Sequence, residues 1–147
     1  MANESFLQEL ETFFLALADK TRLRLLNLMR DEEICVCFFT EVLGESQPKI
    51  SRHLAYLRNA GLVESRRDGK WMHYRIIEPE NEVAKRVLRE TLQGLKERDD
   101  MQQDYEKLYV ACCGISVPVT ISRAPKPETF AQPNMNYERE ELDTFLL

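Results

Sequence analysis

Hydrophobic positions in the first part of the chain recur every three or four residues, the period of an amphipathic helix. This pattern predicts a first helix over residues 4–18. Its apolar positions are Phe6, Leu7, Leu10, Phe13, Phe14 and Leu17. Asp19 is a suitable N-cap for a second helix. A short third helix is predicted over residues 34–43, and Gly44 follows it as a typical helix-terminating residue.

A fourth helix is predicted after a short turn. Ser46 has the side chain of an N-cap, and Pro48 falls in the first turn, where its missing N–H is not needed. The stripe formed by Ile50, Leu54 and Leu57 predicts a buried side, and the helix is expected to end near residue 61.

The period then changes from helix to strand. Two strands, over residues 62–67 and 71–76, flank the dipeptide Asp68-Gly69, which favours a tight type I′ hairpin. Alternation in the second strand predicts three inward side chains and three outward ones. The inward set is Met72, Tyr74 and Ile76, and the outward set is Trp71, His73 and Arg75. A long helix over residues 80–109 follows.

Two helices joined by a short turn and followed by a basic hairpin are typical of a winged helix-turn-helix. The sequence therefore predicts a mainly α fold with a small β-hairpin wing. We expect residues 1–112 to form one DNA-binding and dimerisation domain. Residues 113–147 contain four prolines and are expected to form an irregular C-terminal tail.

The distribution of charge supports a nucleic-acid surface, although the whole chain carries −5. Residues 47–76 hold seven Lys or Arg and only two acidic residues, and such a basic island suits the phosphate backbone. The predicted DNA-binding residues are Gln47, Lys49, Ser51, Arg52 and His53 on the fourth helix and Arg66, Arg67 and Lys70 in the wing. For His53 two roles stay open, a DNA contact or packing beside the turn.

One recognition helix reads only a few base pairs, so a two-fold dimer on double-stranded operator DNA is expected, with the two helices about 34–36 Å apart. The first helix has more aromatic surface than one core needs. We therefore expect a homodimer that pairs through the first and last helices.

The four cysteines fall in two close pairs, Cys35/Cys37 and Cys112/Cys113. The chain has neither a signal-peptide pattern nor an apolar run long enough to span a membrane, so we expect a cytoplasmic protein without membrane contact. In the cytoplasm, cysteines more often act as metal ligands or reactive thiols than form structural disulfides. Thiolates are soft donors and suit soft ions. Residues i and i+2 of a helix point roughly 200° apart. An ion held by Cys35 and Cys37 is therefore expected to distort the start of the third helix.

Several motifs resemble the ArsR/SmtB family of metal-responsive repressors. They are LADKTRLRLL at residues 17–26, SQPKISRHL at 46–54, LRNAGLV at 57–63 and DGK at 68–70, with Tyr74. The resemblance covers about residues 5–98. It implies a homodimer that represses without inducer and releases DNA when inducer binds.

Residues 33–37, EICVC, resemble the arsenic-type signature of that family. Thr40 stands where relatives often carry a third cysteine, and Phe38 where they carry an acidic residue. Cys112 or Cys113 is a candidate for the third sulfur. The two can also form their own site or be a packed pair without a ligand.

The predicted function is a transcriptional repressor that leaves its operator when thiolates bind As(III) or Sb(III), with no organic cofactor. A thiol redox-sensing repressor and a Cd/Pb-type sensor are the alternatives. The family's histidine-based zinc site is not expected, because the only histidines are His53 and His73. Without a Cys-x-x-Cys motif or a phosphate-binding glycine loop, an enzyme with catalytic residues is not expected.

Overall fold

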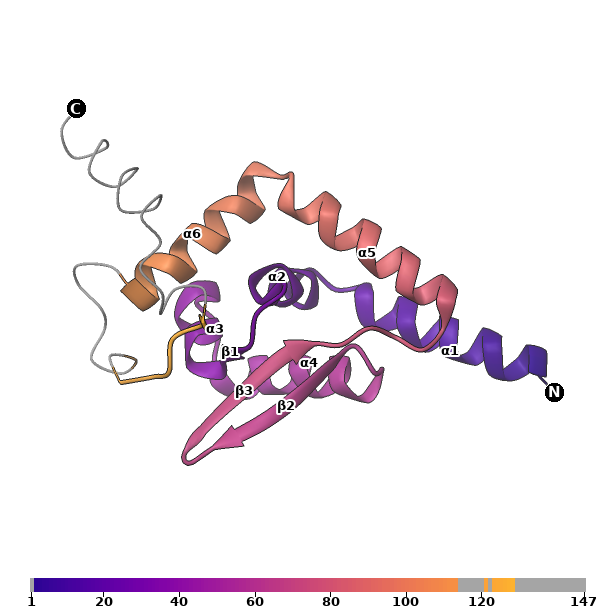
Figure 1. The fold of residues 1–147 in the computed structure, drawn as a ribbon, viewed down its shortest axis with the longest axis horizontal. Helices are drawn as coiled ribbons and strands as arrows, with labels where there is room; N and C mark the ends of the chain where they lie inside the picture. The colour runs from indigo at the N-terminus through magenta and orange to yellow at the C-terminus, as the bar shows by residue number, and fades with distance from the viewer. Residues whose placement is uncertain (1, 114–120, 122, 129–147) are drawn as a thin grey trace.

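The computed structural model describes residues 2–113, 121 and 123–128. The elements run in the order α1 (Ala2–Leu17), α2 (Lys20–Met29), β1 (Ile34–Cys35), α3 (Val36–Leu43), α4 (Gln47–Asn59), β2 (Val63–Asp68), β3 (Trp71–Ile76), α5 (Glu82–Lys96) and α6 (Asp99–Cys113) (Figure 1). The mainly helical fold with a hairpin wing is the one predicted. No helix among the described residues is long and apolar enough to cross a membrane.

The predicted helix boundaries around the central helices are confirmed by their caps. Asp19 accepts a hydrogen bond from the Arg22 backbone N–H at 3.0 Å, and Ser46 accepts one from that of Lys49 at 3.4 Å. Gly44 ends α3 in the left-handed conformation, with φ 65°. Such caps each contribute about 1 kcal/mol. The caps at Gly44 and Ser46 fix the short turn between α3 and α4.

One core holds α4 in place. Its predicted stripe of Ile50, Leu54 and Leu57 is fully buried. The stripe belongs to the same cluster as Phe38 and Phe39 of α3. Burial of side chains this large stabilises by about 1.5–3 kcal/mol each. The opposite side of α4 is therefore left exposed on a rigid support.

The prediction of a third helix starting at Ile34 is wrong by two residues. Ile34 and Cys35 form β1, which pairs with Tyr74 and His73 of β3 and gives a sheet of order β1-β3-β2. An isolated apolar stretch of this length cannot be assigned by periodicity, and pairing with β3 decides it. The added strand also explains why His73 is 4% exposed, against the prediction that it faces outward.

The predicted hairpin is confirmed, but its turn is shifted by one residue. Asp68 pairs with Trp71, so Gly69 and Lys70 are the two turn residues. Only Gly69 of this pair has positive φ, at 60°. Positive φ at the first position alone is the pattern of a type II′ turn, in which glycine is favoured, rather than type I′.

The predicted single last helix is wrong, because it divides at Glu97 and Arg98 into α5 and α6. Asp99 and Asp100 open α6, where acidic residues favour a new helix N-terminus. α6 turns back and packs across α2 and α3 (Figure 1). Arg24 of α2 donates two hydrogen bonds to buried Asp104, at 2.7 and 3.0 Å, and anchors α6 there.

Most of the predicted irregular tail lies outside the described residues. Within the part that is described, Ile121 and Ala124 are buried against the core. This part of the tail therefore packs on the domain.

Candidate dithiol site and nucleic-acid interface

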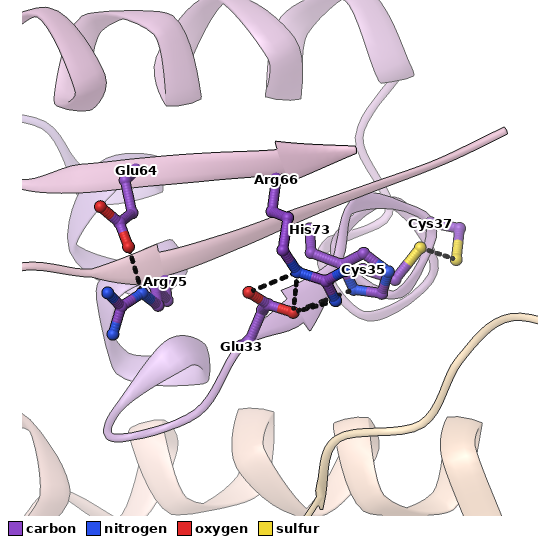
Figure 2. Close-up of polar contacts among 7 residues, drawn as sticks. All are labelled: Glu33, Cys35, Cys37, Glu64, Arg66, His73 and Arg75. Atoms are coloured by element: carbon purple, nitrogen blue, oxygen red, sulfur yellow. Dashed lines mark hydrogen bonds and ion pairs between the residues drawn. The ribbon is translucent and has the colours of Figure 1, made fainter. Parts of the chain in front are cut away.

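Cys35 and Cys37 bring their sulfur atoms together where β1 meets α3. The Cys37 Sγ–H donates to the Cys35 Sγ at 3.2 Å (Figure 2). Cys35 has extended backbone, φ −68° and ψ 137°, and is the N-cap of α3 rather than a helical residue. This corrects the expectation of diverging sulfurs, which assumed that both residues were helical. One ion can therefore bridge the pair without unwinding α3.

The two thiols differ in acidity because they share one hydrogen bond. The hydrogen bond from Cys37 lowers the pKa of Cys35 to about 7, and the N–H dipoles of Cys37 and Val36 act in the same direction. The pKa of Cys37 is raised, first because its proton is held by Cys35 and second because it is buried. Thiolates are the form that binds soft metals. Cys35 therefore supplies the first thiolate near neutral pH.

We expect the thiolate absorbance of Cys35 to rise with a midpoint near pH 7. The measurement is a pH titration of ultraviolet absorbance in a Cys112→Ser/Cys113→Ser background, in which Cys35 and Cys37 are the only thiols. Cys37→Ala removes the donor and should move the midpoint upward, toward the usual range for a thiol of about 8.5. An unchanged midpoint in Cys37→Ala would contradict this assignment of the shared proton.

Among the described side chains, no group of three potential ligands includes this pair. Thr40, at the position of the family's third cysteine, donates its hydroxyl to the Cys37 carbonyl at 2.8 Å. Cys112 is 1% exposed near the end of α6, which packs against α3. The Cys113 side chain lies outside the part of the chain that the structure describes. Across the described ranges, no group of three His, Cys, Asp or Glu is arranged for a metal. A role for Cys112 and Cys113 therefore stays a prediction.

Glu33 links the dithiol end of the sheet to the wing. Its carboxylate accepts hydrogen bonds from Arg66 Nη2 at 2.5 Å and Nε at 3.0 Å, and its Oε1 lies 3.9 Å from Nδ1 of His73 (Figure 2). The hydrogen bond from Arg66 lowers the pKa of Glu33. Arg66, predicted to contact DNA, is thus engaged by an ion pair. Sequence reasoning missed this link, because its partners are far apart in the chain.

The predicted recognition residues lie at the start of α4 with different surroundings. Gln47, Ser51 and Arg52 are exposed. Lys49 is half-buried, and its Nζ lies 3.0 Å from Glu45. His53 is also half-buried, with Nδ1 3.3 Å from Nη1 of Arg22. His53 thus packs beside Arg22 and Asp19, and a contact with DNA stays a prediction.

The tip of the wing presents exposed cations. Arg67 and Lys70 are exposed, and the Lys70 Nζ lies 5.0 Å from the centre of the Trp71 ring. Within residues 2–113, the structure shows no carboxylate partner for four cations of the basic island. These are Arg52, Arg58, Arg67 and Lys70. Two of them lie on α4 and two in the wing.

Arg22 is a supporting residue that the sequence reasoning did not identify. Its guanidinium donates to the carbonyls of Leu15 and Ala16 and lies 4.2 Å from the centre of the Tyr56 ring. These contacts tie the end of α1 to α4. Its only sequence signal was the LADKTRLRLL motif itself.

Residues 19–65 match a family profile described as "Bacterial regulatory protein, arsR family". The "Arsenical resistance operon repressor" of Escherichia coli K12 is 51% identical over 73 residues, which cover 49% of this chain and 62% of that protein. This chain therefore spans less than two thirds of that relative. A "Transcriptional repressor SmtB homolog" of Synechocystis is 36% identical over 92 residues, 63% of this chain and 67% of that one.

A solved structure gives the same result for the fold. It is a solution structure of a homodimeric winged helix-turn-helix DNA-binding domain from Mycobacterium bovis, described as a possible ArsR-family regulator. The TM-score is 0.54 at 28% identity, over 65% of this chain and 85% of that one. Sequence and structure agree that the chain belongs to the ArsR family of bacterial regulatory proteins.

Proposed function

We propose that this protein is a transcriptional repressor that binds double-stranded DNA as a homodimer and releases it when Cys35 and Cys37 capture As(III) or Sb(III). The observation that carries the proposal is the pair of sulfurs 3.2 Å apart at the start of α3, the helix that packs against α4. The E. coli relative is named as a repressor of arsenical resistance, which supports this choice of inducer. Two thiolates are donors that suit both ions.

The DNA-binding surface in this proposal is the exposed side of α4 together with the wing. Gln47, Ser51 and Arg52 can reach base edges in the major groove, whereas Arg58, Arg67 and Lys70 can contact phosphates. Arg66 is held by Glu33, so it orients the wing and contributes less to DNA binding than its neighbour Arg67.

We expect Arg67→Ala to weaken DNA binding about equally for all sequences and to reduce its salt dependence. A dimer loses two phosphate contacts, so the slope of log K against log salt should become shallower by roughly 1.8. Fluorescence anisotropy at several salt concentrations measures this slope. Lys107→Ala, which removes one cation from an exposed position of α6, is the matched control, and an unchanged slope in Arg67→Ala would remove Arg67 from the interface.

The second copy is proposed to dock on α1 and α5. Four apolar side chains of α1 are exposed by 42–63%: Phe6, Leu7, Phe14 and Leu15. The last helix was predicted as one element but divides into α5 and α6. α5 lies against α1 and therefore continues this surface. An apolar area of this kind on a small protein marks an interaction site. The homodimeric M. bovis structure supports a second copy as the occupant.

The release mechanism in this proposal does not require α3 to unwind. Cys35 pairs with His73 of β3, and His73 in turn pairs with Arg66 of β2. An ion that changes the separation of the two sulfurs therefore acts on both α3 and the sheet that carries the wing. By linkage, an inducer that binds the DNA-free dimer 100-fold more tightly weakens DNA binding by the same factor. This corresponds to about 2.7 kcal/mol.

The direct test is fluorescence anisotropy of a labelled duplex selected in vitro for binding to this protein. Arsenite is titrated into the complex in the presence of a phosphine reductant, which keeps the thiols reduced without competing as a dithiol. We expect full release at stoichiometric arsenite per protomer. A complex that persists at large arsenite excess would contradict the proposal.

The redox alternative is favoured by the same 3.2 Å separation of the two sulfurs and by the lowered pKa of Cys35. A reactive thiolate beside a second thiol is the arrangement of a redox-sensing cysteine pair. Release by peroxide alone, without release by arsenite under reductant, would assign the protein to that class. Release by Cd(II) or Pb(II) at lower concentration than arsenite would assign it to the other alternative.

A further inference from the structure

A buried nitrogen of His73 has no partner among the residues that the structure describes. His73 is 4% exposed, and its Nε2 makes no hydrogen bond to any of them. Leaving a buried polar atom unsatisfied costs about 1–3 kcal/mol. An exception of this kind asks for an explanation, such as a ligand that binds there.

The dithiol lies beside this ring. Cys35 and His73 are directly opposite each other in the antiparallel pair of β1 and β3. Side chains at opposite positions have their Cβ atoms about 4.5–5.5 Å apart on the same face of a sheet. Figure 2 shows the His73 ring between the Glu33 carboxylate and the Cys35 side chain.

The other ring nitrogen faces a carboxylate. Nδ1 of His73 lies 3.9 Å from Oε1 of Glu33, the same oxygen that accepts a hydrogen bond from Nη2 of Arg66. A carboxylate at Nδ1 favours the tautomer with its proton there and a lone pair on Nε2. Metal-binding histidines commonly donate a hydrogen bond to an outer carboxylate that orients the ring. Glu33 is in position for this role, although its 3.9 Å separation from Nδ1 is longer than a hydrogen bond.

We propose that His73 Nε2 is a third donor that joins Cys35 and Cys37 in binding a soft divalent cation such as Cd²⁺. This inference rests on the proposed function, because it extends the same dithiol site. His73 would also take the place of the third sulfur, which Thr40 does not supply. Two thiolates and one imidazole suit Cd²⁺ and Zn²⁺.

Loading requires a rearrangement, since within the described residues no three such side chains are already arranged for a metal. Tetrahedral Zn²⁺, with metal–sulfur bonds of about 2.3 Å, holds two sulfurs roughly 3.8 Å apart, and the larger Cd²⁺ holds them further apart. The sulfurs of Cys35 and Cys37 are now 3.2 Å apart. Binding therefore moves the two sulfurs apart and, through His73, also shifts β3.

The test uses the native chain labelled with nitrogen-15 histidine and loaded with cadmium-113. His53 and His73 are the only histidines, so their signals are assigned with His53→Gln alone. We expect a one-bond cadmium–nitrogen splitting at Nε2 of His73 and none at His53. Glu33→Gln should weaken Cd²⁺ binding about 10- to 100-fold, the usual effect of removing an outer carboxylate. His53→Gln should leave it unchanged.

Thiolate-to-cadmium absorbance, recorded on the same samples, separates two kinds of failure. If this absorbance appears, is lost in Cys37→Ser, and His73 shows no splitting, the third donor is disproved while the dithiol site stands. If Cd²⁺ and arsenite both leave the Cys35 and Cys37 thiolates unbound, the proposed function fails, and this inference fails with it.

Discussion

Replacing Cys37 by serine should abolish the release of DNA by arsenite and leave DNA binding itself within about twofold. Serine keeps the size and the hydrogen bond to Cys35 but removes one of two sulfur donors 3.2 Å apart. The arsenite concentration for half-release should rise at least about 100-fold, equivalent to some 2.7 kcal/mol of lost binding. The anisotropy titration described above measures both quantities.

Thr40→Ser is the matched control, because it alters the same helix and keeps the hydroxyl that donates to the Cys37 carbonyl. It should respond to arsenite as the native protein does. Cys112→Ser with Cys113→Ser tests the tail pair separately, and undiminished release would remove those cysteines from the mechanism. A Cys37→Ser protein that still releases DNA at native arsenite concentrations would exclude the dithiol as the sensor.

Replacing Leu7 by glutamate should convert the dimer to monomers and reduce operator affinity at least 100-fold. Leu7 is 63% exposed on α1, so the charge is tolerated in a folded protomer. In the proposed interface it becomes a buried unpaired charge, which costs about 3–5 kcal/mol. A protomer alone reads only one half-site. Sedimentation equilibrium and anisotropy measure the two effects on the same preparation.

The control for added charge is Gln103→Glu, at an exposed residue of α6. It should leave both dimerisation and DNA affinity unchanged. Leu7→Glu with native circular dichroism, native sedimentation and native DNA affinity would show that α1 is not the dimer surface.

Features that depend on local sequence could be predicted. Asp19 and Ser46 cap their helices as expected, because a cap needs only the N–H groups two or three residues ahead. The buried stripe of α4 follows from periodicity alone. Ile34 and Cys35 could not be assigned in this way, because their strand exists only through pairing with β3, nearly forty residues further along.

The prediction of one long last helix was wrong for a related reason. The nearest glycine, Gly94, lies inside α5, and neither Glu97 nor Arg98 is itself a helix-breaking residue. The anchor is Asp104, whose partner Arg24 lies in α2. Within the segment, Asp99 and Asp100 favour a helix start, but the packing across α2 and α3 that completes the turn depends on residues far away in the chain.

The candidate site was predictable in its residues but not in its geometry. The spacing of Cys35 and Cys37 identified the thiol pair, but the expected divergence of their sulfurs depended on the misassigned helix. The ion pair of Glu33 with Arg66 and the contact of His53 with Arg22 join residues about thirty positions apart. Contacts at such separations follow from the fold as a whole.

In the proposed mechanism, capture of an ion by the dithiol and binding of DNA oppose each other. This opposition can be measured by native mass spectrometry of the duplex-bound dimer during an arsenite titration. We expect two populations, DNA complexes without arsenic and DNA-free dimers with one arsenic per protomer. A dominant species that contains the dimer, the duplex and arsenic bound at Cys35 and Cys37 together would contradict it.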